Sequence, residues 1–544
     1  MKKILLLLFT TLLFAQPSGY DCNGELNGPA LPDDCGICTG GDNSCITYNQ
    51  FLGCDAVCFS GKEVDDCGVC NLDSSLLNLG DLNNDNDINV TDIVMTVSTI
   101  LASNTFNTLA DLDGNCTNDV VDIVAIINQI IYSFPTTLLY SNDPASMTPN
   151  QTRTTIQDHI NDAANYGMDL LFEHPDLTYT IDGSIFIPSD IKIDFNNSRI
   201  KRETGDGADD IFDMLVNQHI VGGNENIVLK NLTIDGNREN DTPLDPSDDL
   251  SVYNELPVNP NHRFSGLKFS NVSNSKLMNI TVEYTVNGEH RDGDLTEYPA
   301  AGIFFTNESS NIYCKNINAY NNDYTGIIIY DSTYITIDGS DTSNNTGSGI
   351  GSKLSHYCNY YHITSVNNGH KPSQWNHNKF SNISINGDCS VVYDLTTSSA
   401  TGSGLNIGHP SLGAKADLSI IKNVTSYENE LEGITIRNSD YVQLSDLTIK
   451  NNKRNNFKIQ NDANANGDYY DASNIRIKNS SIFGYYAYPY DPLIEDDYWP
   501  YFWGGYGLRI EGVLGLDSEC GGHIIDGTEI YNNWYNGIGV INLE

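Results

Sequence analysis

The stretch GIFFTNESSNIYCKNINAYNNDYTGIIIYDSTYITIDGSDTSNNTGSGI (302–350) decides the fold. A glycine followed by apolar residues occurs at Gly302 and Gly326, 24 residues apart, and Gly349 follows 23 residues later. Asparagine pairs at 321–322 and 344–345 mark the same phase of each repeat. A unit of this length, made of short strands and Asn/Gly corners, cannot bury its own apolar side, whereas stacked copies can. The stretch therefore predicts a solenoid of stacked β-coils.

The same signals extend in both directions along the chain. Matching strands occur at 266–269, 404–407, 433–436, 456–459 and 507–510, and asparagine pairs recur at 367–368, 451–452 and 532–533. Upstream, apolar residues at helical spacing predict a helix over 154–167, and short apolar runs predict strands between 169 and 195. The pattern is typical of a mainly β protein, a right-handed parallel β-helix, which we place at 153–544.

The predicted helix and the extended run after it resemble the N-terminal cap and first coils of the pectate-lyase-like superfamily. This resemblance covers roughly residues 150–544 and implies a fold more than an activity, because that superfamily includes lyases, hydrolases, epimerases and non-catalytic adhesins.

The N-terminus, MKKILLLLFTTLLFA (1–15), has two lysines followed by a short apolar run. This pattern is typical of a secretory signal peptide, and the run is too short for a good membrane span. No later run reaches about 18 apolar residues, the length that a spanning helix needs. We therefore expect no membrane span and a secreted, extracellular protein, with association with the cell surface as an alternative.

Residues 16–76 form a cysteine-rich spacer that contains eight of the 13 cysteines. DDCGIC at 33–38 returns as DDCGVC at 65–70, a shift of 32 residues. Paired CxxC motifs can bind zinc, but in an exported Gly/Asp-rich segment they favour disulfides. The two repeats are therefore interpreted as a disulfide-linked spacer, with zinc binding as the alternative.

Residues 77–133 carry two copies of a loop followed by an apolar helix. Oxygen-bearing side chains fall at loop positions 1, 3, 5, 9 and 12, the spacing of a calcium loop: Asp81, Asn83, Asp85, Asn89 and Asp92, then Asp111, Asp113, Asn115, Asp119 and Asp122. Two such units with aspartate at position 12 resemble a dockerin, which implies Ca²⁺ and a cohesin-type protein partner. The second copy departs from the pattern at Cys116 and Asn118, and an acidic hairpin without metal is the alternative. Residues 134–152 are then a linker.

The charge balance limits the partners. There are 28 basic and 71 acidic residues, so the formal net charge is 28 − 71 = −43. A field this negative repels phosphate groups, which argues against nucleic acid and anionic membranes as partners.

Strand alternation predicts which residues of the repeat face outward. One outward column contains Lys268, Phe304, Ile328, Gly351, Asn406, Thr435, Lys458 and Arg509. Beside it run Ser270, Thr306, Tyr330, Lys353, Gly408, Arg437, Gln460 and Glu511, with His409 after Gly408. The sequence thus places Lys353, His409, Arg437, Lys458 and Arg509 on one sheet face.

Long insertions between strands, at 237–265, 284–301, 368–379, 393–403 and 484–505, predict walls beside this face. Aromatic residues in the last of them offer flat apolar surfaces to sugar rings. We expect substrate contacts from Lys458, Arg509, Tyr330, Trp499, Trp503 and His290.

Cations and aromatic rings in an open cleft suit an acidic polysaccharide. A uronate lyase must neutralise a carboxylate and remove the neighbouring C5 proton. We expect Arg437 to neutralise the carboxylate and Lys353 or His409 to act as the base. A hydrolase would need two carboxylates, for which Asp292, Asp294 and Glu511 are candidates. The NTDG, GHG and DPHD motifs of β-helix hydrolases and epimerases do not occur, and a non-catalytic, glycan-binding adhesive protein is the remaining alternative. Cys314 and Cys358 are predicted to be core residues.

Overall fold

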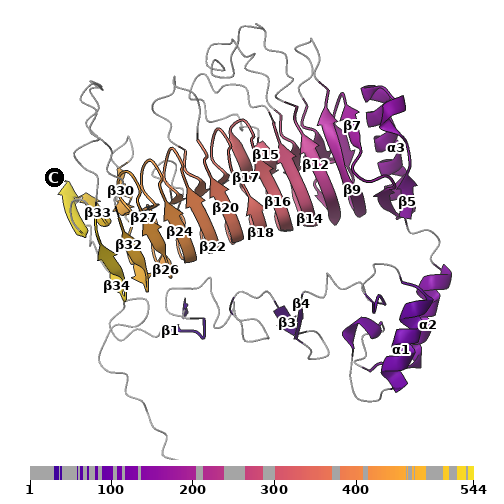
Figure 1. Ribbon diagram of the computed structural model, residues 1–544, viewed down its shortest axis with the longest axis horizontal. Helices are drawn as coiled ribbons and strands as arrows, with labels where there is room; N and C mark the ends of the chain where they lie inside the picture. Colours follow the sequence, from indigo (N-terminus) through magenta and orange to yellow (C-terminus); the bar gives the residue numbers. More distant parts are fainter. Residues whose placement is uncertain are drawn as a thin grey trace, which may run out of the picture.

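The computed structural model shows a long stack of coils with a helix at one end (Figure 1). It describes 30–35, 37–39, 58, 62–64, 70–72, 80–83, 88–101, 107–112, 117–132, 137–203, 212–237, 264–285, 301–369, 380–408, 415–460, 462–463, 469–470, 472–484, 506–513, 523–533 and 537–543. The predicted signal peptide lies outside these residues. Within them, no helix is long and apolar enough to span a membrane.

Two parallel sheets form the stack in the described part of the chain. The sheet of Gly-led strands has 12 strands: β8 (Ile185–Ile187), β10 (Leu215–Asn217), β13 (Leu267–Ser270), β15 (Ala301–Thr306), β17 (Thr325–Tyr330), β19 (Ile350–Lys353), β21 (Ile383–Ile385), β23 (Leu405–Ile407), β25 (Ile434–Arg437), β28 (Phe457–Gln460), β33 (Leu508–Val513) and β36 (Ile538–Leu543).

The second sheet has 18 described strands: β5 (Thr137–Tyr140), β6 (Asp169–Phe172), β7 (Thr178–Ile181), β9 (Ile191–Arg202), β11 (Asn224–Glu225), β12 (Ile227–Asp235), β14 (Val272–Glu283), β16 (Ser310–Tyr320), β18 (Thr333–Asp341), β20 (Asn359–Val366), β22 (Val391–Ser398), β24 (Ile420–Tyr427), β26 (Gln443–Ser445), β27 (Thr448–Lys450), β31 (Arg476–Lys478), β32 (Ser481–Phe483), β34 (Ile524–Asp526) and β35 (Glu529–Tyr531). Successive coils pair in parallel, so the prediction of a parallel β-helix is confirmed.

The register of the Gly-led sheet confirms the predicted columns. Leu267, Ile303 and Ile327 are successive partners and lie in the buried core. The outward column also pairs as predicted, with Lys268 opposite Phe304 at one end and Lys458 opposite Arg509 at the other. The prediction missed β21, which pairs between β19 and β23. The predicted insertion at 393–403 is wrong, because most of it is the regular strand β22.

The two asparagines of each pair have different structural roles. The first asparagine is left-handed, for example Asn321 (φ 57°) and Asn344 (φ 59°), a conformation that asparagine tolerates better than most residues. The second is buried and bonds to the next coil: the Asn322 backbone N–H donates to Asn345 Oδ1 (3.0 Å), and that of Asn345 donates to Asn368 Oδ1 (2.8 Å).

The leading glycines make room for this buried ladder of asparagines. A Cβ atom on Gly326 would lie 2.8 Å from Asn345 Nδ2 and 2.7 Å from the Gly349 carbonyl oxygen. A Cβ atom on Gly433 would lie 2.6 Å from Asn452 Nδ2. The glycine and asparagine signals of the repeat therefore have a single physical cause.

The helix α3 (Pro149–Tyr166) covers the first coils, at the indigo end of the stack in Figure 1. Ile156, Ile160 and Ala163 are buried against them, and Gly167 ends the helix with φ 63°, as predicted. The helix begins before residue 154, because Thr148 and Gln151 form a capping box. The predicted linker 134–152 also contains β5, which already pairs with β6.

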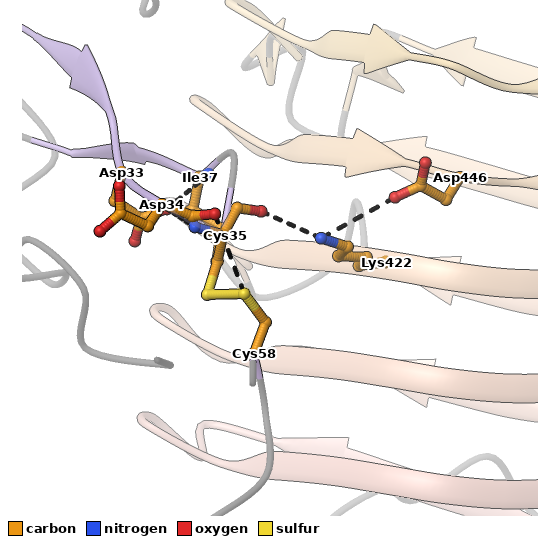
Figure 2. Close-up of a disulfide and its surroundings, with 7 residues drawn as sticks. All are labelled: Asp33, Asp34, Cys35, Ile37, Cys58, Lys422 and Asp446. Carbon is orange, nitrogen blue, oxygen red and sulfur yellow. Dashed lines mark hydrogen bonds and ion pairs between the residues drawn. A yellow bond between two sulfur atoms is a disulfide. The ribbon is translucent and has the colours of Figure 1, made fainter. Parts of the chain in front are cut away.

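Part of the cysteine-rich segment packs on the outer face of the second sheet. Cys35 forms a disulfide with Cys58, which confirms the disulfide interpretation for this pair (Figure 2). Ile37 and Cys35 pack against Val391 and Ile420, and the Lys422 Nζ atom donates to the Cys35 carbonyl oxygen (3.0 Å). Short strands also occur here: β1 (Leu31–Pro32) pairs with β2 (Cys38–Thr39), and β3 (Lys62–Val64) with β4 (Cys70–Leu72).

Two helices, α1 (Val90–Leu101) and α2 (Val120–Tyr132), follow the two predicted calcium loops. They contact each other, and Leu82, Ala110 and Ile126 form a small buried cluster between the two units. The short 3₁₀ helices η2 (Thr108–Ala110) and η3 (Pro144–Ser146) and the hairpin of β29 (Asp462–Ala463) with β30 (Tyr469–Tyr470) complete the described elements.

Replacing the buried ladder asparagine Asn345 by alanine should destabilise the stack. The change removes the partner of the Asn322 N–H and of the Ala319 carbonyl, which Asn345 Nδ2 contacts at 2.9 Å. Leaving two buried polar groups unpaired costs about 2–5 kcal/mol of unfolding free energy. Chemical denaturation measures this change. The control Asn344→Gly, at an exposed left-handed position, should shift stability by less than about 1 kcal/mol; an equal loss in both variants would contradict the ladder's role.

Candidate active site

Three of the five predicted cations come together on neighbouring strands. Lys458 of β28 pairs with Thr435 of β25 on one side and with Arg509 of β33 on the other. Arg437 lies two residues beyond Thr435 on β25, opposite Gln460. Adjacent strands lie about 4.8 Å apart, so the sheet places these cations next to one another.

A buried glutamate lies at the start of the same strands. Glu432 is 1% exposed and immediately precedes Gly433. Its Oε1 atom accepts a hydrogen bond from Asn455 Nδ2 (3.1 Å) and lies 3.7 Å from Arg454 Nε. Ser403 Oγ lies 3.5 Å from its Oε2 atom. We call the four basic residues Arg437, Arg454, Lys458 and Arg509, together with Glu432 beside them, the cation cluster.

Lys458 is the one lysine of the cation cluster, and its pKa is strongly lowered. It is 4% exposed, although its column faces outward, and burial lowers the pKa of its ammonium group to about 7. Glu432 opposes this shift, and Arg454, Arg437 and Arg509 add to it. Burial also lowers the pKa of Arg509, with Arg454 as the next cause. Half of the Lys458 side chains are therefore neutral near pH 7, which suits a proton acceptor.

Two asparagine side chains beside the cluster have unused hydrogen-bonding capacity. Among the described residues, Asn455 Oδ1 and Asn438 Nδ2 are buried and make no hydrogen bond. Buried polar atoms of this kind are rare in native proteins and call for a partner.

Lys353 lies elsewhere on the same face. Its strand β19 is separated from β25 by β21 and β23, which is about 14 Å at the usual strand spacing. The Lys353 Nζ atom lies 5.7 Å from the centre of the Tyr330 ring, so these two predicted residues are neighbours. The other predicted contacts, His409, Trp499, Trp503 and His290, lie outside the described residues, as do the hydrolase candidates Asp292 and Asp294.

Sequence reasoning missed Glu432 and Arg454. Both lie at the corner before a strand, where strand alternation does not predict to which side of the sheet a side chain points. One signal was available: Glu432 is an acidic residue directly before the glycine of the repeat that carries Arg437. The two core cysteines were predicted correctly, because Cys314 and Cys358 are buried free thiols whose pKa values are raised by burial, that of Cys358 to about 12.

The two predicted calcium loops are described in part. Asp92 is buried and accepts hydrogen bonds from the backbone N–H groups of Leu82 (2.8 Å) and Asn89 (2.9 Å). Asp122 does the same for Leu112 and Asp119, both at 2.8 Å. The described residues contain no cluster of three His, Cys, Asp or Glu side chains that could hold a metal. The predicted ligands Asp85, Asp113 and Asn115 lie outside them. The described donors are oxygen atoms only, a set that fits a hard cation such as Ca²⁺.

Fold and site together define a parallel β-helix protein with a cation cluster on one sheet face. No protein-family model matches the sequence, and no curated protein matches it either.

Solved structures of similar shape include the A-module of the Azotobacter vinelandii mannuronan C-5 epimerase AlgE6, at 12% identity over 72% of this chain and 95% of that one, with a TM-score of 0.49. The Streptococcus pneumoniae surface adhesin PfbA matches at 13% identity over 72% and 89%, with a TM-score of 0.47. The Dettilon tailspike protein matches at 11% identity over 75% and 70%, with a TM-score of 0.40. Similarity this distant transfers neither a substrate nor an activity to this chain.

Proposed function

We propose that the protein is a secreted enzyme that cleaves an acidic, uronate-containing polysaccharide by β-elimination. The observation that carries the proposal is Lys458, a buried lysine with a pKa lowered to about 7 on a face that also holds Arg437 and Arg509. A base with a pKa near the working pH and a fixed set of cations are the two requirements of this chemistry.

The reaction assigns a task to each member of the cation cluster. Arg437 and Arg509 bind the uronate carboxylate and offset the negative charge that develops when C5 loses its proton. The neutral Lys458 amine accepts that proton. The C5–H electron pair forms the C4–C5 double bond, and the C4–O bond breaks. The departing oxygen takes a proton from water or from the Lys458 ammonium group. Glu432 positions Arg454 and keeps the cluster from being purely cationic.

Other predicted residues would extend this site along the polymer. Lys353 and Tyr330 lie further along the same face, where they suit a neighbouring sugar of the chain. His409 stays a candidate second base, and His290, Trp499 and Trp503 stay candidate contacts. Secretion is supported by the Cys35–Cys58 disulfide, because disulfides persist in oxidising compartments.

Lys458→Ala should lower kcat on a polyuronate by about 100-fold or more, because the general base is lost. The wild-type rate should rise with pH through about 7, since only the neutral amine accepts a proton. The assay follows the ultraviolet absorbance of the C4–C5 double bond and the reducing ends together, with the full chain and calcium, on polygalacturonate, alginate and neutral glycans.

The matched control is Lys450→Ala, which removes a half-buried lysine of the second sheet. It should keep full activity. New reducing ends without new absorbance would mean that the protein is a hydrolase and not a lyase. If neither signal appears on any polymer, the interpretation becomes a non-catalytic glycan-binding protein. Lyase activity that survives in Lys458→Ala but not in Lys353→Ala would move the base to Lys353.

We also propose that residues 77–133 are a dockerin-like module that holds Ca²⁺ and binds a cohesin-type partner. The buried carboxylates of Asp92 and Asp122, each tying its loop to the start of a helix, support this proposal. Asp81, Asn83 and Asn89 would complete the described part of the first site, and Asp111 and Asp119 that of the second.

Titration calorimetry of the full chain should show calcium binding with a dissociation constant below roughly 1 mM. Asp92→Ala should abolish the first site, because the position-12 carboxylate is lost. Asp158→Ala, at an exposed position on α3, should change nothing. Unchanged calcium binding in Asp92→Ala would contradict the proposal.

A further inference from the structure

A second surface of the molecule combines exposed aromatic rings with a cavity. It lies at the corner where each Gly-led strand leads into the second sheet. Asn274, Asn311, Tyr334 and Tyr357 occupy the same position of successive coils there, since Ser273 pairs with Ser310, Ser310 with Thr333, and Thr333 with His356.

All four residues of this corner are left-handed, with φ between 51° and 57°. Asparagine suits the conformation and gains a ladder bond, because Asn311 Nδ2 donates to Asn274 Oδ1 (2.7 Å). The same conformation continues at Cys389, Leu418 and Tyr441 on the following coils, so it belongs to the corner of the coil and not to the two tyrosines. What distinguishes Tyr334 and Tyr357 is their exposure, 56% and 40%. Exposed aromatic rings of this kind can contact a ligand.

The two rings form a stacked pair, with a centroid distance of 4.9 Å and 8° between their planes. Stacking fixes both rings in place, which lowers the entropy lost when a ligand binds. Because stacking covers one face of each ring, a sugar ring can meet only an outer face, and Tyr357 is the member of the pair that lines the adjoining cavity.

A cavity of about 460 Å³ adjoins this pair and is lined by Tyr357, His356, Asp388 and Asp417. The volume is in the range of small-molecule sites. One oxygen of each aspartate bonds inside the protein: Asp388 Oδ1 accepts the backbone N–H of Asp417 (2.9 Å), and Asp417 Oδ1 accepts that of Asp440 (2.8 Å). The other oxygen lies 3.5 Å from a basic side chain, His356 Nδ1 for Asp388 and Lys415 Nζ for Asp417. Cys389, which also lines the cavity, is disulfide-bonded, so it supplies no thiol.

The charge of this corner differs from that of the cation cluster. Asp388, Asp417 and Asp440 follow one another on successive coils, and Lys415 offsets part of their charge at Asp417. The corner therefore suits a polyuronate less well than the cation cluster does. Carboxylate oxygens accept hydrogen bonds from sugar hydroxyl groups, and the tyrosine faces stack on the ring.

We propose that the Tyr334–Tyr357 corner and its cavity form a binding site for a neutral, hydroxyl-rich glycan, separate from the cation cluster. This site holds the enzyme on a neutral polymer while the cation cluster acts on an acidic one. It stands independently of the reaction type proposed above.

Native affinity electrophoresis of the full chain tests the proposal. The gels contain galactomannan, xyloglucan, mixed-linkage β-glucan or, for comparison, polygalacturonate. The double variant Tyr334→Asn/Tyr357→Asn removes both rings and installs the residue that the corner holds at Asn274 and Asn311, so folding should be preserved. We expect at least one neutral polymer to retard the wild type and the double variant to bind it roughly tenfold more weakly.

The matched control is Tyr166→Asn, which removes a 74% exposed tyrosine at the end of α3 and should bind like the wild type. The proposal is overturned if no neutral polymer retards the wild type, or if the double variant is retarded equally. It is also overturned if the double variant loses retardation only in polygalacturonate.

Discussion

The buried asparagine ladder is the interaction on which the rest of the structure depends. Asn322, Asn345 and Asn368 each bond to the coil that follows, and Asn382, Asn429, Asn452, Asn456 and Asn533 continue the line. The ladder satisfies backbone groups that would otherwise be buried without partners, at a corner where the chain must turn. It also fixes the height of one coil above the next, so every outward residue has a fixed neighbour.

That regularity explains the electrostatics of the cation cluster. Strands in register bring Lys458 and Arg509 side by side whether or not like charges repel, because backbone pairing sets the spacing. Glu432 offsets only part of the positive charge. Burial and neighbouring cations then lower the pKa of Lys458, so the amine, which would be protonated in water at neutral pH, is partly in its neutral, proton-accepting form there. A protein with a net charge of −43 therefore carries a local cluster of basic residues on one sheet face.

Much of the fold could be predicted because glycine and asparagine mark each repeat, and each of these residue types is there for a physical reason. Glycine is required where a ladder amide approaches, as at Gly326, and asparagine is favoured where the chain is left-handed, as at Asn344. The strand β21 was missed because Asn382, not glycine, precedes it, and its side chain enters the ladder itself. Strand alternation correctly predicted that Lys458 faces outward, but it did not predict that Lys458 is buried. Alternation indicates which side of the sheet a side chain is on and not whether other segments cover it. Glu432 was missed because corner residues have no alternation to follow.

The proposed reaction requires that Lys458 is a buried amine with a lowered pKa. The most direct test compares the free energies of unfolding of the wild type and of Lys458→Met as a function of pH. Below pH 7 the lysine is charged in both states, so the folded wild type carries the full cost of the buried charge. Between about 7 and 10.5 only the unfolded chain binds the proton, so wild-type stability should rise with pH relative to the variant. A lowered pKa of Lys458 therefore predicts that the excess stability of Lys458→Met over the wild type decreases across this pH range. A difference that does not change with pH would contradict it.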